Sequence, residues 1–231
     1  MAAPMIDVRN VNKTMRSGGA PLPILRDISF SIPRGQFVSI VGDSGSGKST
    51  LLGLMAGLDD VTSGSIQLDG TEITNLPEDA MARLRGHKIG FVFQSYQLIP
   101  TLTALENVLL PIELNSNVNG LARAKDLLSS VGLAERMHHY PVQLSGGEQQ
   151  RVALARAFVL QPPIILSDEP TGNLDSVNGS HVLELLLNLN RSEGATLVVV
   201  THDPAIASHA TRHITLRDGC LLSDDAPAGD L

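Results

Sequence analysis

The sequence contains a single cysteine, Cys220, so no disulfide can form within the chain. A lone thiol without a catalytic motif around it fits a reducing compartment and a packed or surface position. Long hydrophobic runs are also missing, because the apolar stretches near residues 164–166 and 197–200 are far shorter than the ~20 residues of a membrane helix. The N-terminus lacks the pattern of a signal peptide. We therefore expect a chain that does not itself cross a membrane and reaches one only through a partner.

Basic residues are in the minority. The formal net charge is −7 and the sequence has no long basic run, which argues against sequence-independent binding of nucleic acid. The length of 231 residues and the 42% of hydrophobic residues are ordinary for one large globular domain.

Strand and helix patterns alternate along most of the chain and predict an α/β fold with a mostly parallel sheet. We expect an edge strand at 5–12, a loop at 17–23 and a frayed tail at 223–231. Further strands are expected at 24–33, 37–41, 64–68, 89–93, 164–167, 196–200, 214–216 and 220–222. Helices are expected at 48–56, 104–110, 121–131, 147–160 and 176–191. Within a single domain, 1–231, we predict a nucleotide-binding core, 1–94 and 161–231, with an inserted helical lobe, 95–160.

The strongest motif follows the strand at 37–41 and precedes a helix. It matches the P-loop pattern and consists of Gly42, Asp43, Ser44, Gly45, Ser46, Gly47, Lys48 and Ser49. Small residues let backbone N–H groups surround phosphate oxygens, and the helix N-terminus favours negative charge. Lys48 is predicted to reach the β- and γ-phosphates, Ser49 to ligate Mg²⁺ and Thr50 to lie near the α-phosphate.

Two carboxylates, Asp168 and Glu169, end the apolar strand at 164–167. Beside a P-loop, this position puts Asp168 next to Mg²⁺. Glu169 comes one residue later, at the strand end where ligands bind in open α/β sheets, and is placed to accept a proton from an attacking water. By themselves, two acids at a strand end could equally be solvated.

A third motif opens the helix expected at 147–160. Its residues are Ser145, Gly146, Gly147 and Glu148 within the stretch LSGGEQ. A serine and two glycines at a helix start form a second phosphate-binding end. One nucleotide rarely needs two such ends, so we expect each chain to offer this helix to the γ-phosphate held by a second subunit.

In this order, the P-loop, Gln94 after a strand, LSGGEQ, the DE pair and His202 resemble the ABC ATPase family over essentially the whole chain. The resemblance implies ATP and Mg²⁺ as cofactors, a homodimer, and a P-loop core with an N-terminal antiparallel β part. It implies that Gln94 contacts Mg²⁺ and water, that His202 contacts the γ-phosphate, and that a D-loop ending at Asp175 crosses to the second subunit. By itself, a histidine after a strand would more often be structural.

Within the family, the stretches FVFQSYQLIPTLTALENV and LSGGEQQRVALARA are similar to the MacB, LolD and FtsE branch, and most to the YbbA type. That branch implies an FtsX- or MacB-like permease on the inner membrane, with the ATPase on its cytoplasmic face. It also suggests lipid-like or hydrophobic cargo and a link to a periplasmic esterase. Residues 95–110, with Tyr96, Leu98, Ile99 and Leu102, are expected either to face the permease or to form ordinary lobe core.

One departure from the family concerns the adenine base. The family usually stacks an aromatic residue on it, whereas residues 10–21 contain none and Met15 stands nearest the expected place. A thioether contributes about 0.3–1.5 kcal/mol against a ring, so we predict weak base selectivity.

Two other classes of protein remain as alternatives. A soluble ABC ATPase acting on nucleic acid or ribosomes usually has two ATPase domains, zinc motifs or coiled-coil arms, and none is present in the sequence. A P-loop kinase would have no use for LSGGEQ. The sequence specifies neither the cargo nor the direction of movement.

Overall fold

The N-terminal segment forms a central strand rather than an edge strand. The computed structural model describes residues 3–18, 20–115 and 120–225. In a four-stranded sheet of order β2-β1-β4-β5, β1 (Ile6–Ser17) pairs antiparallel with both β2 (Ala20–Ile32) and β4 (Ser63–Leu68), and β5 (Thr71–Glu72) follows. The antiparallel β part is thus confirmed, but the edge position predicted for residues 5–12 is wrong.

The predicted loop at 17–23 is also wrong, because β1 and β2 form a long hairpin. Met15 pairs with Leu22, and Arg16 pairs with Pro21. Glycine and proline in this stretch favour a loop. However, β2 lies at the edge of its sheet, where a proline removes no hydrogen bond to a further strand.

A parallel group of strands follows from continuous apolar runs. β3 (Phe37–Val41) pairs in parallel with β8 (Thr196–Val200) and β9 (Arg212–Arg217), and β10 (Cys220–Asp225) pairs antiparallel with β9. Every residue of β8 is buried, as expected for a strand covered on both faces. Since β10 extends to Asp225, the frayed tail predicted from Ser223 is wrong up to that residue, and the remainder lies outside the described residues.

Contacts divide the chain into two compact units, residues 1–85 with 196–231 and residues 86–195. The first unit holds both strand groups described above, α1 (Lys48–Met55), most of α2 (Glu78–Lys88) and α7 (Pro204–Ala207). Sequence patterns missed α2, because only Met81 of this polar helix is buried. The second unit contains more than the predicted lobe 95–160, whose boundaries stay a prediction.

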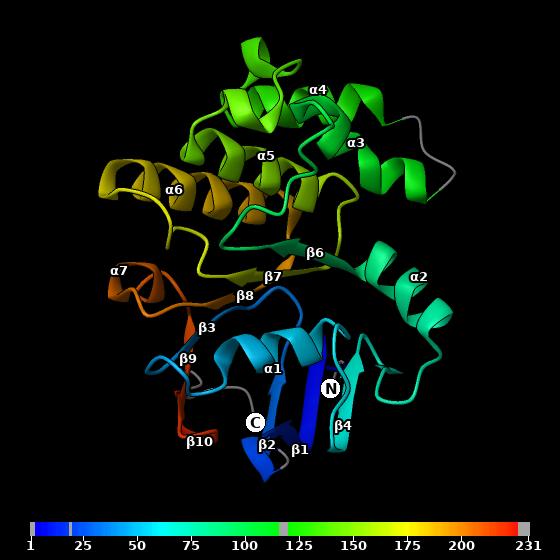
Figure 1. Cartoon of the computed structure of the whole chain (residues 1–231), viewed down its shortest axis with the longest axis vertical. Coiled ribbons are helices and arrows are strands. Elements are labelled where there is room, and N and C mark those ends of the chain that lie inside the picture. The colour runs from blue at the N-terminus through cyan, green and yellow to red at the C-terminus, as the bar shows by residue number, and fades with distance from the viewer. Residues whose placement is uncertain (1–2, 19, 116–119, 226–231) are drawn as a thin grey trace. The chain divides into compact units, whose positions relative to one another are not determined.

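The second unit is organised around the helix that carries the LSGGEQ motif. This helix, α5 (Gly146–Phe158), contacts α3 (Ala104–Leu114), α4 (Leu121–Ser130), α6 (Ser176–Glu193) and β6 (Ile89–Val92). Figure 1 shows α3 and α4 close to α5, and α6 running beside it. The two strands of this unit, β6 and β7 (Ile164–Asp168), pair in parallel. Two 3₁₀ turns, Ala134–Arg136 and Pro141–Gln143, lead into α5.

Side chains hold α5 at both ends. Ser145 caps its N-terminus. At the C-terminus, Arg123 of α4 donates to the carbonyl oxygens of Phe158 and Val159 and pairs with Glu193 of α6. These contacts satisfy some of the unpaired backbone groups at each end of α5 and tie its C-terminus to α4 and α6.

Candidate nucleotide site

The P-loop connects β3 to α1 and has the backbone that phosphate binding requires. Gly42 and Gly47 have φ values of 149° and 97°. A Cβ atom at Gly42 would collide with the carbonyl oxygen of Leu216, and one at Gly47 would lie 2.6 Å from Leu25 Cδ2. No other residue type fits either position without strain. The tip of the loop, Asp43 to Gly45, is exposed.

Lys48 is held toward the loop. Its side chain is largely buried, and Nζ donates to the carbonyl oxygens of Gly42 at 2.7 Å and Asp43 at 2.9 Å. The buried hydroxyl of Ser46 has no hydrogen-bond partner within the described part of the chain. A held ammonium and an unsatisfied buried hydroxyl in one loop fit an anionic ligand such as a phosphate chain.

A pocket of about 260 Å³ opens along the loop. It is lined by Gly45, Gly47, Lys48, Ser49, Thr50 and also Ile24 of β2. Ile24 was missed from the sequence because it precedes the motif by some twenty residues and reaches the pocket only through pairing of β2. Met15 lies on β1, is 49% exposed and pairs with Leu22.

His202 follows β8 within the same unit. The N–H of Thr201 donates to the carbonyl oxygen of Ile40, just before the P-loop, so the turn that carries His202 lies at the P-loop end of β3. Asp203 caps α7, which fixes the far side of this turn. The structure therefore brings His202 to the strand end from which the P-loop starts, and its predicted contact with the γ-phosphate stays a prediction.

The two acidic residues end β7 in the second unit. Asp168 is the last residue of the strand, and Glu169 follows with a φ of 44°. A left-handed backbone in a bulky residue is uncommon and is concentrated at functional sites. The N–H of Gly172 donates to the carbonyl oxygen of Glu169 and closes the turn.

Gln94 lies directly against the segment that follows Glu169. Asn173 Nδ2 donates to the carbonyl oxygen of Gln94 at 2.9 Å. A Cβ at Gly172 would be 2.8 Å from Gln94 Nε2 and 3.4 Å from Glu169 Cβ. The structure thus places Gln94 and Glu169 on either side of Gly172, an arrangement that has no signal in the sequence.

Ser145 forms a reciprocal cap with Glu148. Its Oγ accepts from the Glu148 N–H, and the Glu148 carboxylate accepts from the Ser145 N–H at 2.8 Å. The latter hydrogen bond lowers the pKa of Glu148. Because Oγ is the acceptor in this cap, its O–H group can still donate a hydrogen bond to a ligand. A Cβ atom at Gly146 would lie 2.7 Å from Tyr96 Oη, and one at Gly147 would lie 3.0 Å from Asn178 Oδ1, so neither position has room for a side chain without a shift of its neighbour.

Asp175 has a structural role in the single chain. It is exposed and caps α6 by accepting from the N–H groups of Val177 and Asn178. Hydrogen bonding, mainly from the Asn178 side chain, lowers its pKa. Its predicted contact with a second subunit stays a prediction.

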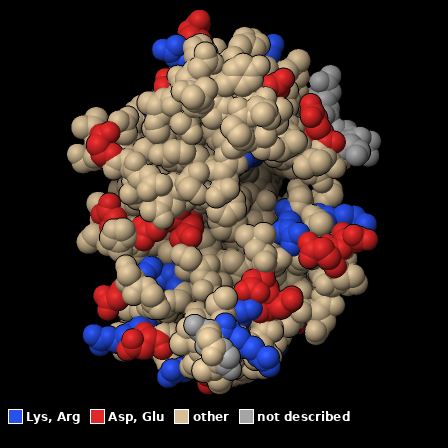
Figure 2. All heavy atoms as spheres, in the orientation of Figure 1, with Lys and Arg blue, Asp and Glu red and all other residues tan. Residues whose placement is uncertain are grey.

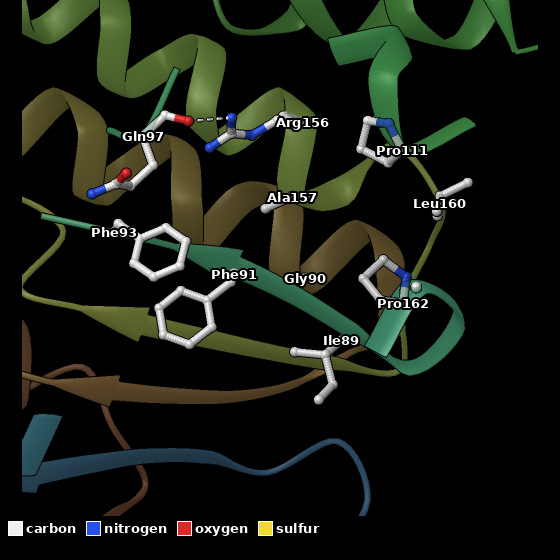
Figure 3. Close-up of a pocket in the computed structure, with 11 residues that line it drawn as sticks. Ile89, Gly90, Phe91, Phe93, Gln97, Pro111, Arg156, Ala157, Leu160 and Pro162 are labelled. Carbon is white, nitrogen blue, oxygen red and sulfur yellow. Dashed lines mark hydrogen bonds between the residues drawn. The ribbon is translucent and has the colours of Figure 1, made fainter. Parts of the chain in front are cut away.

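A further pocket of about 280 Å³ lies in the second unit next to the segment after Gln94 (Figure 3). The rings of Phe91 and Phe93 are stacked at 4.0 Å on one side of it. Its other lining residues include Ile89, Gln97, Pro111, Arg156, Leu160 and Pro162. Of the predicted interface residues, Tyr96, Leu98 and Leu102 are half-buried and Ile99 is 37% exposed.

A P-loop on a parallel sheet, acids at a strand end and a serine-capped glycine helix define a P-loop ATPase with a signature helix. The family model described as ABC transporter matches residues 25–172. The chain belongs to this family, as its ATP-hydrolysing subunit.

Relatives agree with this assignment over nearly the full chain. The chain is 48% identical to the uncharacterized ABC transporter ATP-binding protein YbbA of Escherichia coli K12, covering 95% of this chain and 97% of YbbA. It is 46% identical to the lipoprotein-releasing system ATP-binding protein LolD of Syntrophus aciditrophicus, covering 95% and 99%. It is 44% identical to the macrolide export protein MacB of Syntrophobacter fumaroxidans, covering 98% of this chain but only 32% of MacB.

The fold matches a solved cassette closely. The dimeric, post-hydrolysis structure of the ATP-binding cassette MJ0796 bound to ADP and Pi has a TM-score of 0.90 and 43% identity, covering 98% of this chain and 100% of that chain. The α/β P-loop fold predicted from the sequence is therefore confirmed. No helix among the described residues is both long enough and apolar enough to span a membrane.

Proposed function

We propose that two copies of this chain close around two ATP molecules and thereby drive a permease of the FtsX or MacB type at the cytoplasmic face of the inner membrane. The observation that carries this proposal is the N-terminus of α5. The Ser145 O–H group can donate a hydrogen bond there, and helix N–H groups favour an anion. The P-loop already provides one phosphate site per chain, so a second one is best explained by the nucleotide of the other copy. The dimeric state of MJ0796 supports this.

The residues then take distinct roles. Lys48 and His202 contact the γ-phosphate from one chain, and Ser145 with Gly147 contacts it from the other. Asp175 lies in the loop that crosses between the copies. Glu169 takes a proton from the attacking water, whose oxygen bonds to the γ-phosphorus as the bond to the β–γ bridging oxygen breaks. Release of phosphate removes the contacts that join the two chains, so the dimer opens.

Mg²⁺ is the metal that the donors fit. Ser49, Gln94 and Asp168 offer a hydroxyl, an amide and a carboxylate oxygen, and Mg²⁺ prefers such hard oxygen ligands together with substrate phosphates. Among the described residues, no three His, Cys, Asp or Glu side chains gather as in an all-protein metal cage. When bound, Mg²⁺ would neutralise charge on the β- and γ-phosphate oxygens.

The permease is proposed to dock beside the segment 95–110. An apolar pocket with stacked Phe91 and Phe93 lies next to this segment, and Asn107 holds the segment in shape through hydrogen bonds to Ile99 and Leu102. The similarity to LolD of a lipoprotein-releasing system and to the macrolide export protein MacB supports hydrophobic or lipid-like cargo. A link to a periplasmic esterase is part of the same proposal.

A pull-down tests the partner. The Glu169→Gln variant, loaded with Mg·ATP, is used as bait for detergent-solubilised native membranes, and we expect it to recover a polytopic permease identified by mass spectrometry. The same bait with Leu98→Asp should lose the permease, whereas the control bait with Leu114→Asp should keep it, because Leu114 is already 74% exposed on α3. Circular dichroism checks that each bait is folded.

Recovery of ribosomal or DNA-bound material without a membrane protein would favour the alternative, a soluble ABC ATPase acting on nucleic acid. The distribution of charge on the surface argues against that alternative. On the face shown in Figure 2, basic and acidic side chains are interspersed rather than gathered by sign, and the net charge is −7.

Base recognition is proposed to rely on aliphatic contacts. Met15 and Leu22 form an exposed cross-strand pair, and Ile24 lines the P-loop pocket two residues after Leu22. Replacing Met15 by Tyr should strengthen ATP binding about two- to tenfold, because an aromatic stack contributes about 0.5–1.5 kcal/mol beyond burial. The ATP/GTP affinity ratio should change as well. Leu222→Tyr on β10 is the control, and unchanged affinity and ratio would refute the proposal.

A further inference from the structure

The segment after Gln94 has an unusual backbone. Tyr96 and Gln97 have φ values of 60° and 50°, so two consecutive residues with side chains occupy the left-handed region. That region is sterically unfavourable for residues other than glycine, and it persists only where the surroundings enforce it. Within the segment, the N–H and Nε2 of Gln97 donate to Ser95, and further contacts come from outside it.

Arg156 of α5 provides two of these outside contacts. Its Nη2 donates to the carbonyl oxygen of Tyr96 at 2.8 Å, and its Nη1 donates to that of Gln97 at 2.6 Å. The rigid planar guanidinium can bridge two carbonyl groups in fixed geometry, which the single ammonium of lysine cannot reproduce. Burial lowers the pKa of Arg156, in keeping with a side chain committed to internal contacts. Figure 3 shows the Arg156–Gln97 bond at the wall of the pocket.

A second side chain of α5 holds the other side of Gln94. Gln150 is fully buried, and its Nε2 donates to the carbonyl oxygens of Pro170 at 2.7 Å and Phe93 at 3.4 Å. Thus α5 holds the chain one residue before Gln94 and again two and three residues after it. The helix that presents Ser145 at its N-terminus also fixes the backbone around Gln94.

We propose that Arg156 is a positioning residue that locks the Gln94 turn to the signature helix, so that the two move together. Gln97 and Arg156 both line the pocket beside the proposed permease-facing segment. An occupant of this pocket therefore acts on the bond between them and, through it, on Gln94 and α5 at once. The link to a permease rests on the proposed function, whereas the effect on ATP turnover does not.

Steady-state kinetics of the full chain test this inference. Arg156→Ala is expected to lower kcat for ATP hydrolysis about tenfold, with KM for ATP within about twofold of the unchanged chain, because a loosened Gln94 affects the reaction more than P-loop binding. Millimolar guanidinium ion should restore part of kcat, since the pocket gives a free ion access to the vacated position. The same concentration of sodium chloride should not.

The matched control is Arg123→Ala. Arg123 is also part-buried and also donates to two backbone carbonyl groups, but these are at the C-terminus of α5. This variant should lower the melting temperature without lowering kcat per folded molecule and without response to guanidinium. Equal kcat losses in the two variants, or no rescue of Arg156→Ala, would show that Arg156 only supports the fold.

If Arg156→Ala does not fold, the Arg156→Lys variant tests the same proposal. Lysine keeps the charge but offers a point donor in place of the planar fork, so kcat should fall with unchanged KM. A kcat equal to that of the unchanged chain would overturn the proposal. The unchanged chain in the same assay separates this outcome from a failure of the proposed function, because only a chain without turnover would question the ATPase itself.

Discussion

Replacing Glu169 by Gln is expected to lower the ATP turnover rate by about 10²–10³-fold, because a general base contributes about 10²–10⁴-fold and an amide cannot accept the proton of the attacking water. Glutamine has nearly the same shape, so it bears the same left-handed backbone at φ 44° that the carboxylate bears. ATP binding should persist, since the P-loop is unchanged. Phosphate release measured at saturating Mg·ATP gives the rate.

The same variant should accumulate as a closed dimer. Without hydrolysis, the γ-phosphate contacts that join the two chains are not removed, so light scattering should detect a dimer with ATP and a monomer with ADP. Glu184→Gln is the control, because Glu184 is an exposed carboxylate on α6. A Glu169→Gln chain that hydrolyses ATP at the normal rate would refute the assignment of Glu169 as the base.

Replacing Lys48 by Ala is expected to weaken ATP binding about 10- to 100-fold, because a hydrogen bond to a charged group contributes about 1.5–3 kcal/mol. The loop itself should survive the change. Lys48 Nζ donates to the carbonyl oxygens of Gly42 and Asp43, and both residues lie at or near the surface. Isothermal titration with ATP, ADP and AMP measures the effect.

The loss should depend on the phosphates of the nucleotide. It should be large for ATP, smaller for ADP and nearly absent for AMP, because Lys48 is assigned to the β- and γ-phosphates. Lys125→Ala on α4 removes the same charge from an exposed position and should leave all three affinities unchanged. A uniform loss for all three nucleotides would indicate a disturbed fold rather than a lost phosphate contact.

Some elements could be predicted from the sequence because their signals are local. β3, the P-loop and α1 are contiguous, and the strand, glycine turn and helix patterns of residues 37–56 agree with one another. The start of α5 is equally local, since Ser145 and Glu148 form a reciprocal cap three residues apart. The loop predicted at 17–23 was wrong because its conformation depends on pairing with another segment. Pro21 and Pro23 lie in a strand because they pair with β1.

The chemistry could be predicted without a structure, because motifs of contiguous residues indicate a phosphate loop, a strand-end acid pair and a capped helix in a fixed order. The distant residues that support these motifs became visible in the folded chain alone. Ile24 reaches the P-loop pocket through strand pairing. Arg156 lies 60 residues from Tyr96 in the sequence yet bonds to its carbonyl oxygen. Hydrogen bonds to backbone carbonyl groups leave no pattern in the sequence, since every residue carries the same acceptor.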